Sequence, residues 1–189
     1  MTTEAKPSSR DRLLDAAAAL AYRDGVGVGI AELCKAAGVS KRSMYQLFES
    51  KDELLAESLK RRAPGFAERL RPAEGDARTP RERILYVFGQ VEEAASADTY
   101  RGCPFLAVQV ELKDEEHPAS RVARRVKADL AGFFRDEAER GGAADPELLA
   151  RQLMLVFDGA SARAGIGADS PAGLVVPTVV VLLDAAGVG

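Results

Sequence analysis

The stretch Ile30–Lys51, which reads IAELCKAAGVSKRSMYQLFESK, decides the fold of this chain. Apolar residues at helical spacing predict a short helix over Ile30–Ala37 and a second helix that Ser40 caps and that ends near Phe48. Between them Gly38 can adopt a positive φ, where a side chain would clash, so the two helices can meet at a tight turn. The stretch therefore predicts a helix-turn-helix.

A helical wheel gives the second of these helices two faces. The apolar face holds Met44, Leu47 and Phe48, and we expect it to pack on the two preceding helices. The polar face holds Lys41, Arg42, Tyr45, Gln46 and Glu49. Cations, a phenol and an amide suit phosphates and base edges, and Ser40 with the helix N-terminus can donate to a phosphate. An ordinary solvated helix separates its residues in the same way, so the wheel alone leaves both interpretations open.

The rest of the chain also has a helical pattern. Spacing and caps predict a helix after Ser8 or Ser9 and another after a capping box of Ser50 and Glu53. Residues 71–80, RPAEGDARTP, predict a loop. Later helices are expected to begin at Pro80, Pro104, Pro118 and Asp145-Pro146. The expected fold class is therefore all-α.

The last apolar segment, Leu174–Leu183, has the sequence LVVPTVVVLL, which is rich in β-branched residues and resembles a strand. No other segment offers a partner strand, and an isolated strand would leave its backbone groups unpaired. We therefore predict a helix that the pair Ser170-Pro171 opens and that kinks at Pro177. A helix that is apolar on all sides must be covered on several sides, which favours a dimer interface.

Composition limits the classes of function. The 189 residues carry a net charge of −3. Residues 1–62, which contain the helix-turn-helix and are called the head below, hold 11 basic and 9 acidic residues. The head is therefore slightly basic, whereas the rest of the chain is acidic. Two cysteines exclude a disulfide framework or a four-thiolate zinc site, and one histidine excludes a metal site with two imidazoles. We expect no metal site, no catalytic residues and no cofactor.

The chain start has no apolar segment typical of a signal peptide, and Leu174–Leu183 is too short to span a bilayer. These features predict a cytoplasmic protein without membrane contact.

Two stretches together resemble the N-terminal domain of TetR-type bacterial transcriptional regulators. They are RDRLLDAAAALAYRDG, at residues 10–25, and IAELCKAAGVSKRSMYQLFESKDELL, at residues 30–55. The resemblance covers about residues 10–60. It implies an all-α homodimer with a three-helix helix-turn-helix DNA-binding domain over residues 1–50. Residues 51–189 would then form a C-terminal helical domain that binds an effector and dimerises through its last two helices.

The resemblance also assigns site residues. Double-stranded operator DNA would be contacted by Ser40, Lys41, Arg42, Ser43, Tyr45 and Gln46, with Lys51 holding a phosphate. Val28 and Gly29 stand where the family usually has hydroxyl residues, so the helix that follows them is expected to lack a side-chain cap.

The resemblance further implies an effector cavity among the fifth to eighth helices. Gln109, Glu111 and Asp158 are its polar candidates for orienting a ligand. The candidate pocket residues are Phe88, Phe105, Gln109, Leu112, Phe133, Phe134, Met154, Phe157 and Asp158. An ordinary hydrophobic core explains most of these residues equally well.

The function that we expect is a ligand-responsive transcriptional regulator. It would bind a palindromic operator as a homodimer and repress until a small molecule of unknown identity releases it. Two other classes stay open at this point. One is an all-helical enzyme that uses His117 or the carboxylates of Glu115 and Glu116, and the other is a dimeric adaptor that binds protein.

Overall fold

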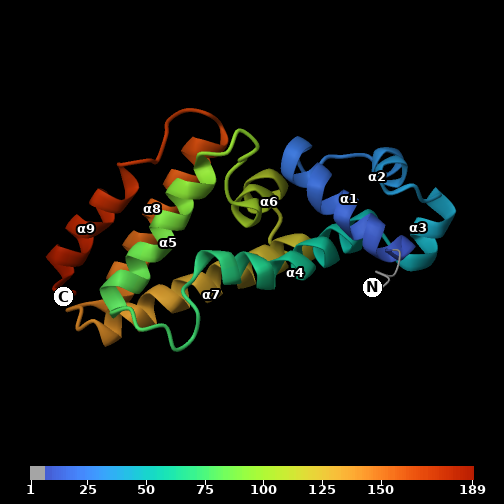
Figure 1. Cartoon of the computed structure of the whole chain (residues 1–189). Coiled ribbons are helices and arrows are strands. Elements are labelled where there is room, and N and C mark those ends of the chain that lie inside the picture. Colours follow the sequence, from blue (N-terminus) through green and yellow to red (C-terminus); the bar gives the residue numbers. More distant parts are fainter. Residues whose placement is uncertain (1–6) are drawn as a thin grey trace, which may run out of the picture. The chain divides into compact units, whose positions relative to one another are not determined.

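The computed structural model describes residues 7–189, and within them it contains nine α-helices and no strand (Figure 1). This confirms the expected all-α class. The helices are α1 (Ser9–Asp24), α2 (Ile30–Ala37), α3 (Lys41–Leu47), α4 (Lys51–Leu70), α5 (Pro80–Ala95), α6 (Pro104–Leu112), α7 (Pro118–Arg140), α8 (Pro146–Gly165) and α9 (Val175–Ala186). No helix in this part of the chain has the length and apolar character needed to cross a bilayer.

Local sequence signals set most helix starts. The hydroxyl of Ser8 caps α1 by accepting the N–H of Asp11 at 3.1 Å, and the Asp145 carboxylate caps α8 by accepting the N–H of Leu148 at 2.9 Å. Each bond satisfies one of the backbone donors that a helix N-terminus leaves without a partner. As expected, α2 has no side-chain cap, because its N-cap residue is Gly29.

The capping box expected at the start of α4 is only half right. Ser50 Oγ accepts the N–H of Glu53 at 3.0 Å, as predicted. The Glu53 carboxylate, however, accepts the N–H of Glu49 at 2.6 Å. The reciprocal bond of the box therefore reaches one residue further back than the sequence pattern indicates.

The predicted start of the last helix was wrong. Its first residue is Val175 rather than a residue next to Pro171, because the Glu92 carboxylate of α5 accepts the N–H groups of Val175 and Val176 at 3.1 and 3.0 Å. No kink is required at Pro177, which lies in the first turn, where its missing N–H leaves no helical bond unmade.

The described residues pack into two compact units. The first comprises Met1–Ala63, as far as it is described, with Val108–Arg124, and the second comprises Pro64–Ala107 with Arg125–Gly189. These packing units differ from the functional division at residue 50, which stays a proposal about which part of the chain reads DNA.

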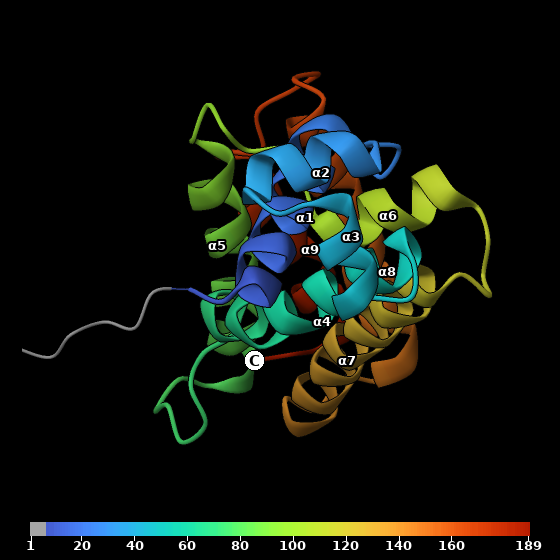
Figure 2. The same ribbon diagram turned by 90° about the vertical axis from the view of Figure 1, so that its right-hand side faces the viewer.

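The first unit is built on α1. In Figure 2, α2 and α3 lie across the side of α1 that faces the viewer. Their apolar faces form one core with the start of α4, consisting of Leu13, Leu14, Ala17, Leu20, Val28, Leu33, Cys34, Ala37, Met44, Phe48 and Leu54. This core fixes the positions of α2 and α3, because burying each large apolar side chain contributes about 1.5–3 kcal/mol.

The second unit is built on α5, α8 and α9, which pack against one another (Figure 1). Phe88 of α5 and Phe134 of α7 stack with ring centroids 5.5 Å apart, and both are fully buried. Gly165, at the end of α8, lies so close to the backbone of Arg101 that an added Cβ would be 2.6 Å from its carbonyl carbon. This unit therefore has a tightly packed interior.

Candidate functional site

The turn between α2 and α3 has the geometry that the sequence predicts. Gly38 adopts the left-handed conformation, with φ 61° and ψ 40°, and its N–H donates to the Lys35 carbonyl at 3.2 Å. Two residues later, Ser40 Oγ accepts the N–H of Ser43 at 3.0 Å and starts α3. The sequence of the turn thus fixes the direction of α3 with respect to α2.

The two faces of α3 are separated as the wheel predicts, apart from one residue. Met44 is fully buried, and Phe48, which directly follows α3, is buried as well. Leu47, expected on the apolar face, is 38% exposed. The six residues proposed to contact the operator all lie on or next to α3; Ser40, Lys41, Arg42, Tyr45 and Gln46 are exposed, and Ser43 is half-buried.

The exposed face of α3 can bind an anionic polymer. Lys41 and Arg42 make no ion pair with any other residue that the structure describes, so their charges are available to a partner. Tyr45, 54% exposed, adds a donor and an apolar ring, and Gln46 adds an amide. An amide can bind adenine through two hydrogen bonds and a guanidinium can bind guanine in the same way.

Lys51, proposed to hold a phosphate, makes internal contacts in the structure. Its ammonium donates to the carbonyls of Val26 at 3.1 Å and Val28 at 3.3 Å, in the linker between α1 and α2. Whether the ammonium also reaches a phosphate on DNA remains a proposal.

Glu111, expected to orient a ligand, also contacts this linker. Its Oε2 accepts the N–H of Val26 at 2.7 Å. No local pattern indicates this contact, since 85 residues separate the two positions. The sequence drew attention to Glu111 only as a polar residue in an apolar helix.

The aromatic residues proposed for an effector pocket are mainly core residues. Phe88, Phe105 and Phe134 are fully buried, and Phe157 is 2% exposed. Phe105 packs edge-on against Phe66, with centroids 5.0 Å apart. Phe133 is half-buried beside Phe134, and Gln109 and Leu112 are half-buried in the first unit. Most of these candidates therefore belong to the hydrophobic core, and their role in an effector pocket stays a prediction.

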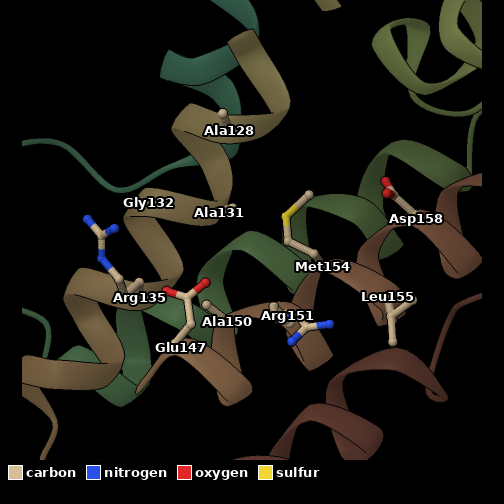
Figure 3. Close-up of a pocket in the computed structure, with 10 residues that line it drawn as sticks. All are labelled: Ala128, Ala131, Gly132, Arg135, Glu147, Ala150, Arg151, Met154, Leu155 and Asp158. Atoms are coloured by element: carbon tan, nitrogen blue, oxygen red, sulfur yellow. The ribbon is translucent and has the colours of Figure 1, made fainter. Parts of the chain in front are cut away.

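Met154 and Asp158 do line a common groove, which runs between α7 and α8 (Figure 3). It has a volume of about 440 Å³. Its walls are Ala128, Ala131, Gly132 and Arg135 of α7 and Glu147, Ala150, Arg151, Met154, Leu155 and Asp158 of α8. Asp158 forms an ion pair with Lys127, whose Nζ lies 4.6 Å from the centroid of the Phe157 ring. The groove thus has an apolar floor and charged groups along its edges.

The residues of the competing enzyme hypothesis have structural contacts. His117 Nδ1 accepts the N–H of Ala119 at 3.1 Å, and its Nε2 lies 3.4 Å from the Asp52 carboxylate. Glu115 and Glu116 form ion pairs with Arg124 and Arg121. These groups hold chain segments together and do not converge on a common site.

Comparisons with known proteins give a consistent result. The family model of the bacterial regulatory proteins of the tetR family matches residues 13–58, which include α2 and α3. The HTH-type transcriptional regulator BetI of Brucella anthropi is 26% identical over 170 residues, covering 88% of this chain and 86% of that protein.

Solved structures extend the similarity to the whole chain. A TetR-family transcriptional regulator from Streptomyces coelicolor is 25% identical with a TM-score of 0.84, covering 95% of this chain and 96% of that one. A crystal structure from Streptomyces avermitilis, assigned to the TetR transcriptional regulators, is 69% identical with a TM-score of 0.95, covering 97% of this chain and 100% of that one. The helix-turn-helix, the all-α fold of the described residues and these relatives agree. The chain belongs to the TetR family of transcriptional regulators, and it is a regulator rather than an enzyme.

Proposed function

We propose that this regulator is a repressor that binds a palindromic operator as a homodimer and leaves it when a small molecule binds. The observation that carries the proposal is the exposed face of α3. There Lys41, Arg42, Tyr45 and Gln46 are open to solvent, on a helix that the buried Met44 and Phe48 hold in place. Because a bacterial regulator of transcription acts where the DNA is, the proposed site of action is the cytoplasm.

The proposed complex follows from the geometry of DNA. A two-fold dimer presents two copies of α3, and heads about 34–36 Å apart enter successive major grooves on one side of the duplex. The two-fold symmetry of the protein then requires a palindromic operator. Effector binding would favour a second arrangement of the heads, which requires a difference in effector affinity between the two states.

The experiment that tests this proposal is selection of bound sequences from a random duplex pool by the purified full-length protein at moderate salt. Enrichment of a palindrome supports a dimeric, sequence-specific regulator and supplies a labelled probe for screening effectors. If a folded dimer enriches no sequence above the level of a protein-free control, the proposed operator binding is wrong.

Arg42→Ala and Gln46→Ala are expected to change base preference. Each loses about 1–3 kcal/mol of discrimination at one base position of each half-site, because a good two-bond contact to a base edge provides that amount. Repeating the selection with each variant measures the effect. Arg69→Ala, which removes an exposed cation from α4 outside the helix-turn-helix, is the control and should select the wild-type operator. An unchanged operator for both head variants contradicts the assigned base contacts.

Salt is expected to weaken operator binding strongly. If each protomer neutralises about three to five phosphates, the plot of log K against log salt concentration should have a slope of roughly −5 to −9. Fluorescence anisotropy with the selected duplex between about 50 and 200 mM salt gives the slope. A slope near zero would mean that Lys41, Lys51 and the helix ends do not contact phosphates.

The proposed dimer interface is the outer face of α8 and α9. Leu155 and Val181 are 75% and 65% exposed, and Leu148 and Leu174 are 49% and 53% exposed. Gly159 lies on the same face of α8, where an added Cβ would meet no atom of this chain within 4 Å. A glycine inside a helix costs about 0.5–1 kcal/mol relative to alanine, and the close approach of a partner helix would explain its presence. Exposed apolar side chains of this kind are expected to be buried against a second copy of the chain.

The groove between α7 and α8 is the proposed effector site. Its volume of about 440 Å³ falls in the range of small-molecule pockets, and Met154 supplies apolar surface while Arg151 and Asp158 supply opposite charges. Compounds found by release of the operator probe identify the effector class. Loss of release in Met154→Arg, with operator binding retained, would support this location.

A further inference from the structure

The linker between α1 and α2 is composed of residues that do not hold a fixed shape by themselves. Its sequence, Gly25–Gly29, reads GVGVG. Three glycines in five residues give a large loss of backbone entropy on ordering. Nevertheless the linker is ordered, with Val26 and Val28 buried, and α2 begins directly at its end without a side-chain cap. Other groups must therefore stabilise its conformation.

Glu111 of α6 stabilises the linker from one side. Its Oε2 accepts the Val26 N–H at 2.7 Å, the short distance expected for a charged acceptor. Gly25, with φ +90°, makes room for the carboxylate, because a Cβ there would lie 2.7 Å from the same oxygen. The positive φ at position 25 thus favours glycine, and a Cβ there would push the Glu111 carboxylate away from its place.

Lys51 of α4 stabilises the linker through its carbonyl groups. Its Nζ donates to the carbonyls of Val26 and Val28 at 3.1 and 3.3 Å. The Glu111 carboxylate thus accepts from one N–H of the Gly25–Gly29 segment, and the Lys51 ammonium donates to two of its carbonyls. The helix that follows this segment, α2, carries the turn and α3.

We propose that Glu111 is a positioning residue for DNA binding: by holding the Val26 N–H it keeps the Gly25–Gly29 linker in the one conformation that presents α2 and α3 to the operator. The proposal rests on the proposed operator binding. Glu111 would thus determine operator affinity without contacting DNA, although it lies in α6 and is remote in sequence from the helix-turn-helix. If only the held linker binds DNA, affinity falls in proportion to the population of that state.

In Glu111→Ala, the loss of the negative charge and the loss of linker positioning are expected to change operator affinity in opposite directions. Removing an anion makes the protein less negative, which by itself strengthens binding to DNA. Releasing the linker weakens binding, and the loss of one hydrogen bond of this kind corresponds to about a three- to tenfold increase in Kd. The direction of the change therefore distinguishes the two effects.

The experiment compares three full-length variants for affinity to the selected operator duplex. Glu111→Ala removes charge and acceptor, whereas Glu111→Gln removes the charge and keeps an acceptor oxygen. Glu115→Ala, at an exposed position in the same α6–α7 segment, removes a surface charge together with its exposed ion pair to Arg124, which contributes little to stability. We expect weaker binding for Glu111→Ala, and binding equal to or tighter than wild type for Glu111→Gln and Glu115→Ala. Equal affinities of Glu111→Ala and Glu115→Ala overturn the proposal, and so does an equal loss in Glu111→Gln and Glu111→Ala.

Hydrogen exchange at the Val26 amide, followed by NMR without DNA, gives a second readout. We expect faster exchange in Glu111→Ala and near wild-type exchange in Glu111→Gln. An unchanged Val26 amide in Glu111→Ala overturns the proposal, whatever the DNA result. If the wild type binds no duplex while the Val26 amide responds as expected, Glu111 holds the linker but operator binding, and with it the role in DNA binding, is wrong.

Discussion

Replacing Leu155 and Val181 together by Asp is expected to convert the protein to a monomer and to lower operator affinity by about 100-fold or more, since one head alone loses the gain from simultaneous binding of two half-sites. Both side chains are exposed in the isolated chain, so the substitutions leave its core intact. In a dimer through α8 and α9 they would place unpaired carboxylates in an apolar interface, which is strongly unfavourable. Sedimentation gives the mass, and anisotropy with the selected duplex gives the affinity.

The control for this prediction must add the same charge elsewhere. Ala73→Asp with Ala77→Asp adds two carboxylates at exposed positions of the loop between α4 and α5. This variant should remain a dimer and show only the modest loss of affinity that added negative charge produces. A Leu155→Asp, Val181→Asp protein that remains a dimer at micromolar concentration would show that the interface lies elsewhere. A wild-type protein that sediments as a monomer would contradict the dimer itself.

The parts of the head that the sequence predicted are those fixed by near neighbours. Ser40 accepts from a residue three positions away, and Gly38 takes a positive φ because the turn requires it. The spacing of Met44 and Phe48 places both in the core, as a helical period requires. Features of this kind depend on short stretches, so one sequence is sufficient to predict them.

The parts that sequence could not predict depend on contacts between distant segments. The start of α9 depends on Glu92, 83 residues before Val175, rather than on the local Ser170-Pro171 pattern. The shape of the linker depends on Glu111. Likewise, the sequence offered Phe88, Phe105 and Phe134 either as pocket residues or as core residues and gave no means of distinguishing a cavity wall from a filled core. Only the packing of α7 against α8 shows where a groove remains.

Glu137→Ala is expected to cost about 3–5 kcal/mol of unfolding free energy, because it leaves a buried cation without its anion. Glu137 is 4% exposed and accepts from Arg83 Nε at 2.7 Å, while Arg83 is itself 8% exposed. Without the carboxylate, the Arg83 guanidinium retains the Ala73 carbonyl at 3.1 Å as an acceptor. Urea unfolding followed by circular dichroism, at one protein concentration for all variants, measures the loss.

Two further variants distinguish the contribution of the buried Arg83–Glu137 ion pair from that of the Arg140–Glu137 ion pair. Arg140 also donates to Glu137, with both distances 3.0 Å, but its side chain is 60% exposed. Arg140→Ala should therefore cost no more than about 1 kcal/mol, because the Arg140 charge is exposed to solvent and Glu137 keeps its ion pair with Arg83. Replacing both buried partners, as Arg83→Met with Glu137→Leu, should cost much less than Glu137→Ala alone, because no charge is left in the interior. If the double variant is as unstable as Glu137→Ala, the loss arises from packing around α5 and α7 rather than from the unpaired Arg83 charge.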